Sequence, residues 1–488
     1  MIRPILFAVV GALCASAGFA PISNPLLMVV GVAVLLIGVL RAERAGDAFA
    51  AGLVFGVVLT SVVMEWLTNL ANEAAIGLGL LQGLFYGSAM LVVWLIKDKP
   101  VKAVAIMVVG TWTAMEFSRE RIPFGGISWG APGYSIGEWT WLRSGAQWVG
   151  TSGLSVVAVG VSTGVALYLV RRDYRPLLVS LGLAALLAAL GAIYPSGPMG
   201  PEIRVAIVQG NSPCPGMRCA NERGLIFESH LELTRTLAAD TYDLVLWPES
   251  STGFGFDPLQ SSEVAQLLSD EAERLGSYLM VGGDRADTPG TFINSNLLYN
   301  RSGDLVGEYR KRHPVPFGEY IPFRSVIGRL SLLSRVPRDM VRGVQPGLFV
   351  VDFGSIGTVI SYEAAFARYS RDATALGASV LVVASNEASY GRSTAAAQLM
   401  DMSRMRAAEN GVDVIHGAVT GSSVLITQGG VLGAPTGLFE KTILTGTVRI
   451  RTAGPTLFSR WGDWLAVAAM LLGALTVVEA AVRKPSDP

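Results

Sequence analysis

The chain has 488 residues, of which 51% are hydrophobic and only 16% are charged, and its mean hydropathy is +0.46. A soluble domain usually carries about 25% charged residues, so this composition excludes a wholly soluble enzyme and an intrinsically disordered chain. The 38 basic and 38 acidic residues balance to a net charge of zero, which gives no support to a nucleic-acid-binding protein.

The apolar residues are concentrated in stretches long enough to cross a membrane. Seven lie within the first 200 residues and one lies near the C-terminus, and the sequence therefore predicts a polytopic helical membrane domain with eight spans. The predicted spans are Pro4–Ala20, Pro25–Leu40, Ala48–Trp66, Gly77–Ile96, Val101–Phe117, Trp148–Val170, Pro176–Tyr194 and Trp464–Val482.

Basic residues between the spans predict the orientation of the chain, because they favour the cytoplasmic side. With a cytoplasmic N-terminus, most basic clusters fall inside, and Arg119, Arg121 and Arg143 are the exceptions. Seven spans then place the polar region outside. We therefore predict a membrane domain of seven helices over 1–200, an extracytoplasmic domain over 201–455, and a final transmembrane helix with a cytoplasmic tail over 456–488.

The predicted outer loop from Arg119 to Arg143 is rich in Gly, Pro and Trp. Aromatic residues at this level often serve only as interfacial anchors. The alternative is a loop that lines an entry for lipid, and the sequence leaves both interpretations open.

The polar region alternates strand-like and helix-like patterns, which predicts an α/β layer fold with a buried sheet. Polar groups follow several of the expected strands at the point where each one ends. Because ligands of such sheets bind outside the carboxyl ends of the strands, these groups are predicted to share a crevice. They are Glu249 after Leu244–Trp247, Lys311 after Glu308–Tyr309, Ser361 to Glu363 after Gly357–Ile360, and Asn386 after Val380–Ala384.

An ordered set of short motifs makes the chain resemble a known family. Their order resembles that of the nitrilase superfamily, and their place among eight spans resembles its membrane-bound branch, the apolipoprotein N-acyltransferases. The motifs are Trp247-Pro248-Glu249-Ser250, Lys311-Arg312-His313 with Pro316-Phe317-Gly318-Glu319, Tyr362-Glu363, Glu116-Phe117-Ser118-Arg119 and Arg460-Trp461-Gly462-Asp463-Trp464.

The resemblance implies an αββα sandwich with a Glu-Lys-Cys triad and no cofactor or metal. It implies transfer of an acyl chain from a phospholipid to the α-amino group of a diacylglyceryl-apolipoprotein, through a covalent acyl-enzyme, at the outer side of a bacterial inner membrane. By this resemblance Glu249 is the general base and Lys311 supports the oxyanion. Glu319, Tyr362, Glu363 and Asn386 match supporting positions.

The chain departs from the family at the nucleophile, because Ser361 stands where the family has Cys. A hydroxyl is far less ionised than a thiol near neutral pH and needs stronger activation. Three interpretations follow: a serine nucleophile, an engineered substitution, or a non-catalytic relative that binds lipid or lipoprotein. Natural divergence is favoured, because the stretch Asn386–Gly391 departs from the family pattern as well.

A membrane-anchored nitrilase-like amidase, with water as the acceptor, is a further alternative. The apolar run Pro316–Arg342 is interpreted either as a mobile lid or as a helix packed on the sandwich. Cys214 and Cys219 are expected to form a local disulfide in an oxidising compartment, with Cys219 as a displaced nucleophile the alternative.

Overall fold

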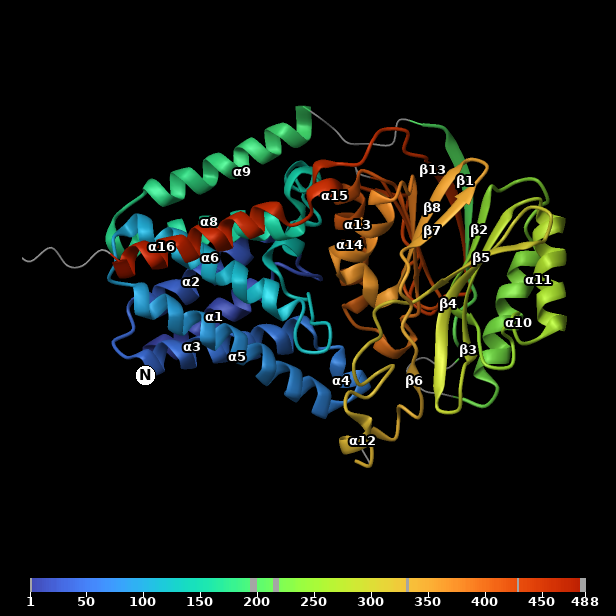
Figure 1. Ribbon diagram of the computed structural model, residues 1–488, viewed down its shortest axis with the longest axis horizontal. Helices are drawn as coiled ribbons and strands as arrows, with labels where there is room; N and C mark the ends of the chain where they lie inside the picture. The colour runs from blue at the N-terminus through green and yellow to red at the C-terminus, as the bar shows by residue number, and fades with distance from the viewer. Residues whose placement is uncertain (1, 194–199, 214–218, 331–332, 428–429, 483–488) are drawn as a thin grey trace, which may run out of the picture. The chain divides into compact units, whose positions relative to one another are not determined.

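The computed structural model describes the chain except for residues 1, 194–199, 214–218, 331–332, 428–429 and 483–488. It divides into two compact units. The helical unit comprises residues 1–195 and 460–488, and the sandwich unit comprises residues 196–459. Figure 1 shows the helices of the first unit and the sheets of the second.

The helical unit is built from apolar helices joined by short turns. Its described helices are α1 (Ile2–Ser16), α2 (Pro25–Leu40), α3 (Ala45–Val63), α4 (Leu67–Leu70), α5 (Asn72–Ile96), α6 (Val101–Arg119), η1 (Pro132–Ile136), α7 (Thr140–Arg143), α8 (Ala146–Arg171), α9 (Arg175–Ile193) and α16 (Trp464–Val482). The short helix α15 (Leu457–Trp461) lies at the boundary between the two units.

Every predicted apolar stretch overlaps a helix. Pro25–Leu40 and Trp464–Val482 have the predicted bounds, and the bounds of the others differ. Among the described residues, five helices (α3, α5, α6, α8 and α9) are long and apolar enough to cross a membrane, and three shorter apolar ones cover Ile2–Ser16, Pro25–Leu40 and Trp464–Glu479. The first stretch was expected to reach Ala20, but its helix ends at Ser16, ahead of Gly18 and Pro21. Eight crossings therefore remain a prediction.

Helices α3 and α5 approach closely because glycines line their contact. A Cβ added at Gly52 would lie 2.8 Å from the Cα of Gly87, and one added at Gly56 would lie 2.8 Å from the Cα of Gly83. Small residues of this kind allow helix backbones in membranes to pack tightly. The close approach fixes the side chains that α3 and α5 present to each other.

The sandwich unit contains two sheets. The described strands are β1 (Glu202–Gln209), β2 (Leu244–Thr252), β3 (Tyr278–Ala286), β4 (Thr291–Tyr299), β5 (Leu305–Arg310), β6 (Asp339–Met340), β7 (Gly347–Val351), β8 (Gly354–Ile360), β9 (Val380–Ser385), β10 (Val414–Ala418), β11 (Val424–Thr427), β12 (Gly430–Leu432) and β13 (Thr442–Arg449). One sheet runs β13-β1-β2-β3-β4-β5 with β6 beside β4, and the other runs β12-β11-β10-β9-β8-β7.

Helices cover the outer face of each sheet, which gives four layers (Figure 1). Strand β1 shows why: Val205 and Ile207 face the core between the sheets, whereas Ala206 and Val208 face the helices. Helices α10 (Glu222–Arg235) and α11 (Ser262–Leu275) pack on that outer face. On the second sheet the outer helices are α13 (Ala367–Ala375) and α14 (Ala395–Asn410).

This arrangement confirms the predicted nitrilase-like αββα sandwich. Parallel pairing joins β1 to β2 and β2 to β3 in one sheet, and β8 to β9 and β9 to β10 in the other. Of these central strands, β2 carries Glu249, while β8 and β9 lead directly into Ser361 and Asn386. A 3-10 turn, η3 (Ser361–Ala365), follows β8 and precedes α13, with an extended residue, Phe366, between them.

Candidate active site

Glu249 lies in an irregular part of β2, where the pairing with β3 shifts register between Trp247 and Thr252. Ser250, the next residue, has a positive φ of 59°. A bulge of this kind redirects side chains and is common beside active sites. Opposite the bulge, Gly282 leaves room for the backbone, since a Cβ there would lie 2.7 Å from the Cα of Glu249. The Glu249 side chain is buried, with 4% exposed.

Lys311 follows the end of β5 and contacts two carboxylates. Its Nζ donates to Oε1 of Glu249 at 2.9 Å and to Oε1 of Glu319 at 2.6 Å. The other oxygen of Glu319 accepts a hydrogen bond from the backbone N–H of Val315 at 2.7 Å. Lys311 is 1% exposed, so a buried ammonium is held by charged partners on both sides.

The electrostatics of this group follow from two carboxylates that share one ammonium. Burial raises the pKa of Glu249, and the neighbouring Glu319 raises it further, while Lys311 opposes both effects. Burial alone would lower the pKa of Lys311, but Glu249 and Glu319 together raise it above its ordinary value. Lys311 therefore remains a cation, and Glu249 accepts a proton more readily than an ordinary glutamate does.

Ser361 stands where β8 turns into η3. Its φ is +49°, a backbone conformation that residues other than Gly rarely adopt, and it is 4% exposed. Strained residues at sharp strand-to-helix turns are characteristic of nucleophiles. Among the described residues, no hydrogen bond joins the Ser361 hydroxyl to Glu249 or Lys311. Catalytic hydrogen bonds are often long before substrate binds, so this geometry is compatible with Ser361 as a nucleophile.

Glu363 ties the turn that carries Ser361 to the loop that carries Lys311. Its carboxylate accepts backbone hydrogen bonds from Ile360 at 2.8 Å, Arg312 at 2.6 Å and His313 at 3.0 Å. It also accepts one from the Tyr309 hydroxyl at 2.8 Å. Burial raises the pKa of Glu363, while the hydrogen bonds from Ile360 and Tyr309 oppose this. Glu363 thus serves as a positioning residue.

Tyr362 stacks on His313, with ring centroids 5.2 Å apart and an angle of 22° between the planes. Burial and the cations of Arg368 and Arg342 lower the pKa of His313 to about 3, so the imidazole is neutral. Its Nδ1 lies 2.7 Å from the hydroxyl of Tyr369. Burial also raises the pKa of Tyr362 well above its ordinary value. Tyr362, His313 and Tyr369 thus pack together beside the turn that carries Ser361.

Asn386 follows β9, and its backbone N–H donates to the second oxygen of Glu249 at 2.8 Å. Its side chain accepts a hydrogen bond from the N–H of Ala388 at 3.1 Å, which stabilises the loop. The next residue, Glu387, is buried, and its carboxylate lies 3.4 Å from Nε2 of His416. The stretch that departs from the family pattern therefore contacts Glu249 through the backbone of Asn386.

Asn294 contacts Glu249, the predicted general base, and was missed from the sequence. It lies in β4. Its side-chain amide donates to Oε1 of Glu249 at 2.8 Å, and its backbone carbonyl accepts from the backbone N–H of Lys311 at 2.9 Å. The signal was present, because a polar Asn-Ser-Asn run interrupts an otherwise apolar strand.

Two other predictions have definite outcomes. Cys219 is disulfide-bonded, so it offers no free thiol as a displaced nucleophile, while Cys214 lies outside the described residues.

The alternative of a packed helix over 316–342 is wrong for the part that is described. Helix α12 (Arg324–Ile327) is a single turn that ends before Gly328, and its Val326 is 76% exposed. The lid interpretation stays a prediction.

The structure therefore brings Glu249, Lys311, Glu319 and the backbone of Asn386 into direct contact, and Glu363 links Ser361 to this group. Tyr362 lies beside it, stacked on His313. Such a site contains a carboxylate able to move protons, a fixed cation and a hydroxyl at a strained turn, which are the parts of an acyl-transfer site.

Comparison with known proteins identifies the family. The carbon-nitrogen hydrolase family matches residues 204–456, and the apolipoprotein N-acyltransferase N-terminal domain matches residues 11–164. An apolipoprotein N-acyltransferase of Geobacter metallireducens is 28% identical and covers 99% of this chain and 96% of its own length. That of Methylococcus capsulatus is 31% identical and covers 73% and 70%.

Among solved structures, a CN-hydrolase superfamily protein of Xanthomonas campestris is 18% identical. The match covers 56% of this chain and 97% of that protein, with a TM-score of 0.38. The two family matches and the relatives that span most of the sequence lead to one conclusion: this chain belongs to the apolipoprotein N-acyltransferase family.

Proposed function

We propose that this protein N-acylates apolipoproteins with Ser361 as its nucleophile. The observation that carries the proposal is the contact of Lys311 with Glu249 and Glu319. The Glu249 carboxylate also accepts a hydrogen bond from the backbone N–H of Asn386. The relatives are named apolipoprotein N-acyltransferases, which supplies the reaction class.

The reaction has two steps, the formation of an acyl-enzyme and the transfer of its acyl group to the amine. In the first, the Ser361 oxygen attacks an ester carbonyl of a phospholipid, Glu249 takes the hydroxyl proton, and Lys311 stabilises the negative charge on the carbonyl oxygen. The C–O bond to the glycerol then breaks, and the departing oxygen receives the proton from Glu249. An acyl ester on Ser361 and a lysophospholipid are the products.

In the second step, the α-amino group of the diacylglyceryl-cysteine attacks the acyl ester. Glu249 takes a proton from the amine, and the Ser361 oxygen leaves and receives that proton, so the enzyme returns to its first state. The raised pKa of Glu249 suits a group that both accepts and returns protons.

The membrane part of the proposal rests on the apolar helices. We propose eight spans, with a membrane domain of seven helices over 1–200, a catalytic domain over 201–455 on the extracytoplasmic side, and a last span with its tail over 456–488. Five long apolar helices and three shorter ones support this arrangement. A phospholipid donor suits an enzyme that is embedded so extensively in lipid.

Complementation tests this function. The full-length chain is expressed in cells whose own N-acyltransferase can be depleted, and growth and the N-terminal acylation of a reporter lipoprotein are measured. The proposal predicts rescue by the wild type and none by Glu249→Gln. A wild-type chain that reaches the membrane intact and leaves the reporter with a free amine would support the non-catalytic relative instead.

A further inference from the structure

A set of buried polar side chains adjoins the loop that carries Asn386. Glu387 follows Asn386 directly, and its carboxylate lies 3.4 Å from Nε2 of His416 on β10. The other ring nitrogen of His416, Nδ1, lies 2.8 Å from the hydroxyl of Ser403 on α14. Glu387 is 2% exposed, and the other two side chains are fully buried. These three residues, which we call the polar tether, connect α14 through β10 to the residue beside Asn386.

The directions of the hydrogen bonds in the polar tether follow from the groups that meet. A carboxylate offers only acceptors, so the ring nitrogen of His416 that faces Glu387 carries a proton. Nδ1 then accepts a hydrogen bond from the Ser403 hydroxyl. The hydrogen bond at one ring nitrogen selects the tautomer of an imidazole, so Ser403 directs the donor of His416 toward Glu387.

The carboxylate of Glu387 depends on this donor. Gly421 leaves space for it, because a Cβ at that position would collide with Oε2 of Glu387. That oxygen has no hydrogen-bond partner among the described residues, and the other oxygen faces His416. A buried carboxylate without a donor is costly, so loss of His416 would favour movement of Glu387 and of the loop that contains it.

Asn386 connects this loop to the predicted general base. Its backbone N–H donates to Oε2 of Glu249 at 2.8 Å. Backbone pairing fixes β9 as far as Ser385, whose carbonyl accepts from the N–H of Val419 at 3.1 Å. Beyond that point, the side chain of Glu387 connects the loop to β10.

We propose that the polar tether positions the backbone N–H of Asn386 against the carboxylate of Glu249. Its members are positioning residues, because they act on Glu249 only through the loop. A hydrogen bond to a carboxylate favours the charged form, so the tether allows Glu249 to act as a base at lower pH. The effect on catalysis rests on the function proposed above, whereas the placement of the N–H does not.

Two substitutions of His416 separate the contributions of its nitrogens. Glutamine places its amide near the position of Nε2, so His416→Gln keeps a donor for Glu387. Asparagine places its amide near Nδ1, so His416→Asn keeps a partner for Ser403 but does not reach Glu387. Ser403→Ala is a milder change that removes only the outer hydroxyl. Its control is Ser370→Ala on α13, a buried serine whose hydroxyl donates to the carbonyl of Ala367 at 3.1 Å.

The first measurement needs no activity. Hydrogen exchange of the full-length protein in detergent, followed by mass spectrometry, reports the opening of residues 385–391. We expect exchange there to be about tenfold faster in His416→Asn, as the loss of one hydrogen bond to a charged group predicts. Ser403→Ala should show a smaller increase, and His416→Gln and Ser370→Ala should exchange as the parent does. Peptides from α10 and α11 should be unchanged in every variant.

The second measurement follows the rate of acyl-enzyme formation against pH. The fall in rate at low pH reports protonation of the base. Without the N–H of Asn386, Glu249 is protonated at higher pH, so this fall should lie about one pH unit higher in His416→Asn than in the parent or in His416→Gln. A merely structural loss lowers the rate equally at every pH. The other charged groups that act on Glu249 are the same in all variants: Lys311, Glu319 and Asp284.

Unchanged exchange of residues 385–391 in both His416→Asn and Ser403→Ala would overturn the proposal. The loop would then be held by its own 3-10 turn, η4 (Ala388–Tyr390), in which the N–H of Tyr390 donates to the carbonyl of Glu387 at 3.0 Å. Faster exchange throughout the sandwich unit, or faster local exchange with an unshifted pH profile, would also overturn it. If the wild-type chain forms no acyl-enzyme, the proposed function fails, and the exchange result still decides the placement of Asn386.

Discussion

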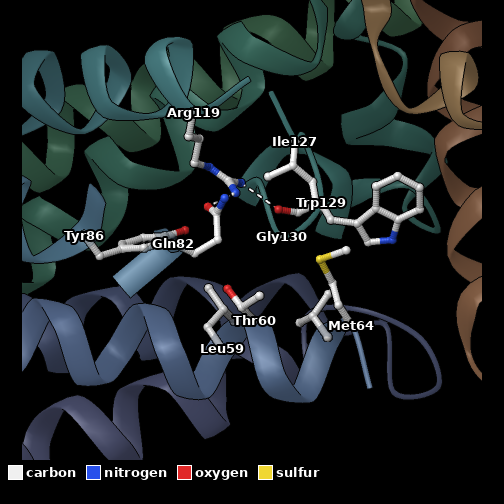
Figure 2. Close-up of a pocket in the computed structure, with 10 residues that line it drawn as sticks. Leu59, Thr60, Met64, Gln82, Tyr86, Arg119, Ile127, Trp129 and Gly130 are labelled. Carbon is white, nitrogen blue, oxygen red and sulfur yellow. Dashed lines mark hydrogen bonds between the residues drawn. The ribbon is translucent and has the colours of Figure 1, made fainter. Parts of the chain in front are cut away.

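Lys311 in the sandwich unit and Arg119 in the helical unit are both buried cations, but their partners differ. Lys311 contacts two carboxylates, so its charge is more than neutralised. Arg119 contacts an amide oxygen and a backbone carbonyl, which are neutral. The comparison shows two ways to hold a buried cation: Lys311 lies between charged carboxylates, and Arg119 lies between neutral oxygen atoms (Figure 2).

Removal of the negative charge from Glu249 tests the first arrangement and has the largest expected effect. Glu249→Gln keeps the shape and the contact with Asn294 but removes the proton acceptor. We expect the rate of N-acylation of a diacylglyceryl peptide to fall by about 10³-fold to 10⁴-fold, near the upper limit for loss of a general base. Glu263→Gln, at an exposed position of α11, is the control. A rate within threefold of wild type would remove Glu249 from the mechanism.

Loss of the cation itself should also destabilise the sandwich unit. Lys311→Met leaves the buried Glu249 and the partly exposed Glu319 without their partner, and breaking a buried pair such as Lys311–Glu249 costs about 3–5 kcal/mol in free energy of unfolding. Lys441→Met breaks an ion pair with Glu232 whose side chains are 39% and 74% exposed, and should cost less than about 1 kcal/mol. Chemical denaturation of both variants measures the difference, and equal losses would contradict the burial argument.

A milder change at the second cation sharpens the comparison. Arg119→Lys keeps the charge but cannot reach Gln82 and the Trp129 carbonyl with one fork. Because no carboxylate is left unpaired, we expect a loss of only about 1–3 kcal/mol, as for hydrogen bonds to a charged group. Arg175→Lys, at an exposed position of α9, should have no effect on the thermal midpoint. A loss as large as that for Lys311→Met would show that Arg119 also has an ionic partner.

The smallest effect concerns pH and the aromatic group beside Ser361. The pKa of His313 is lowered to about 3, so the unfolded chain, with an ordinary histidine, binds more protons between that value and about 6.5. Stability is therefore complete above about pH 6.5 and falls as the pH drops through this window, by about 1 kcal/mol per pH unit. His313→Gln should flatten this slope in urea unfolding at pH 7.0 and 5.5. An unchanged slope would mean that the imidazole is not held neutral.

The sequence predicted much of the fold because its patterns are local. Apolar runs predicted the helices, and alternation predicted the strands near Glu249, Ser361 and Asn386, although β2 does not end before Glu249 but continues to Thr252. The contacts were not predictable, because Asn294 reaches Glu249 only through the pairing of β3 with β4.

The pocket that Arg119 and Tyr86 line in the helical unit was missed for a similar reason. Arg119 belonged to a recognised motif, but its partners Gln82 and Trp129 lie on other segments. The sequence does not indicate that the Tyr86 hydroxyl lacks a hydrogen-bond partner among the described residues, since Tyr86 is one of several aromatic residues in an apolar stretch. Contacts between distant segments depend on packing, which one sequence does not reveal.

The most direct test of the central claim is the intact mass of the full-length protein after incubation with a phospholipid and no acceptor. The account predicts that the chain gains the mass of one acyl group, that fragmentation places it on Ser361, and that a diacylglyceryl peptide removes it. Ser361→Ala should gain nothing. A wild-type chain that acylates the peptide without ever carrying the acyl group, with Ser361→Ala equally active, would contradict a serine acyl-enzyme.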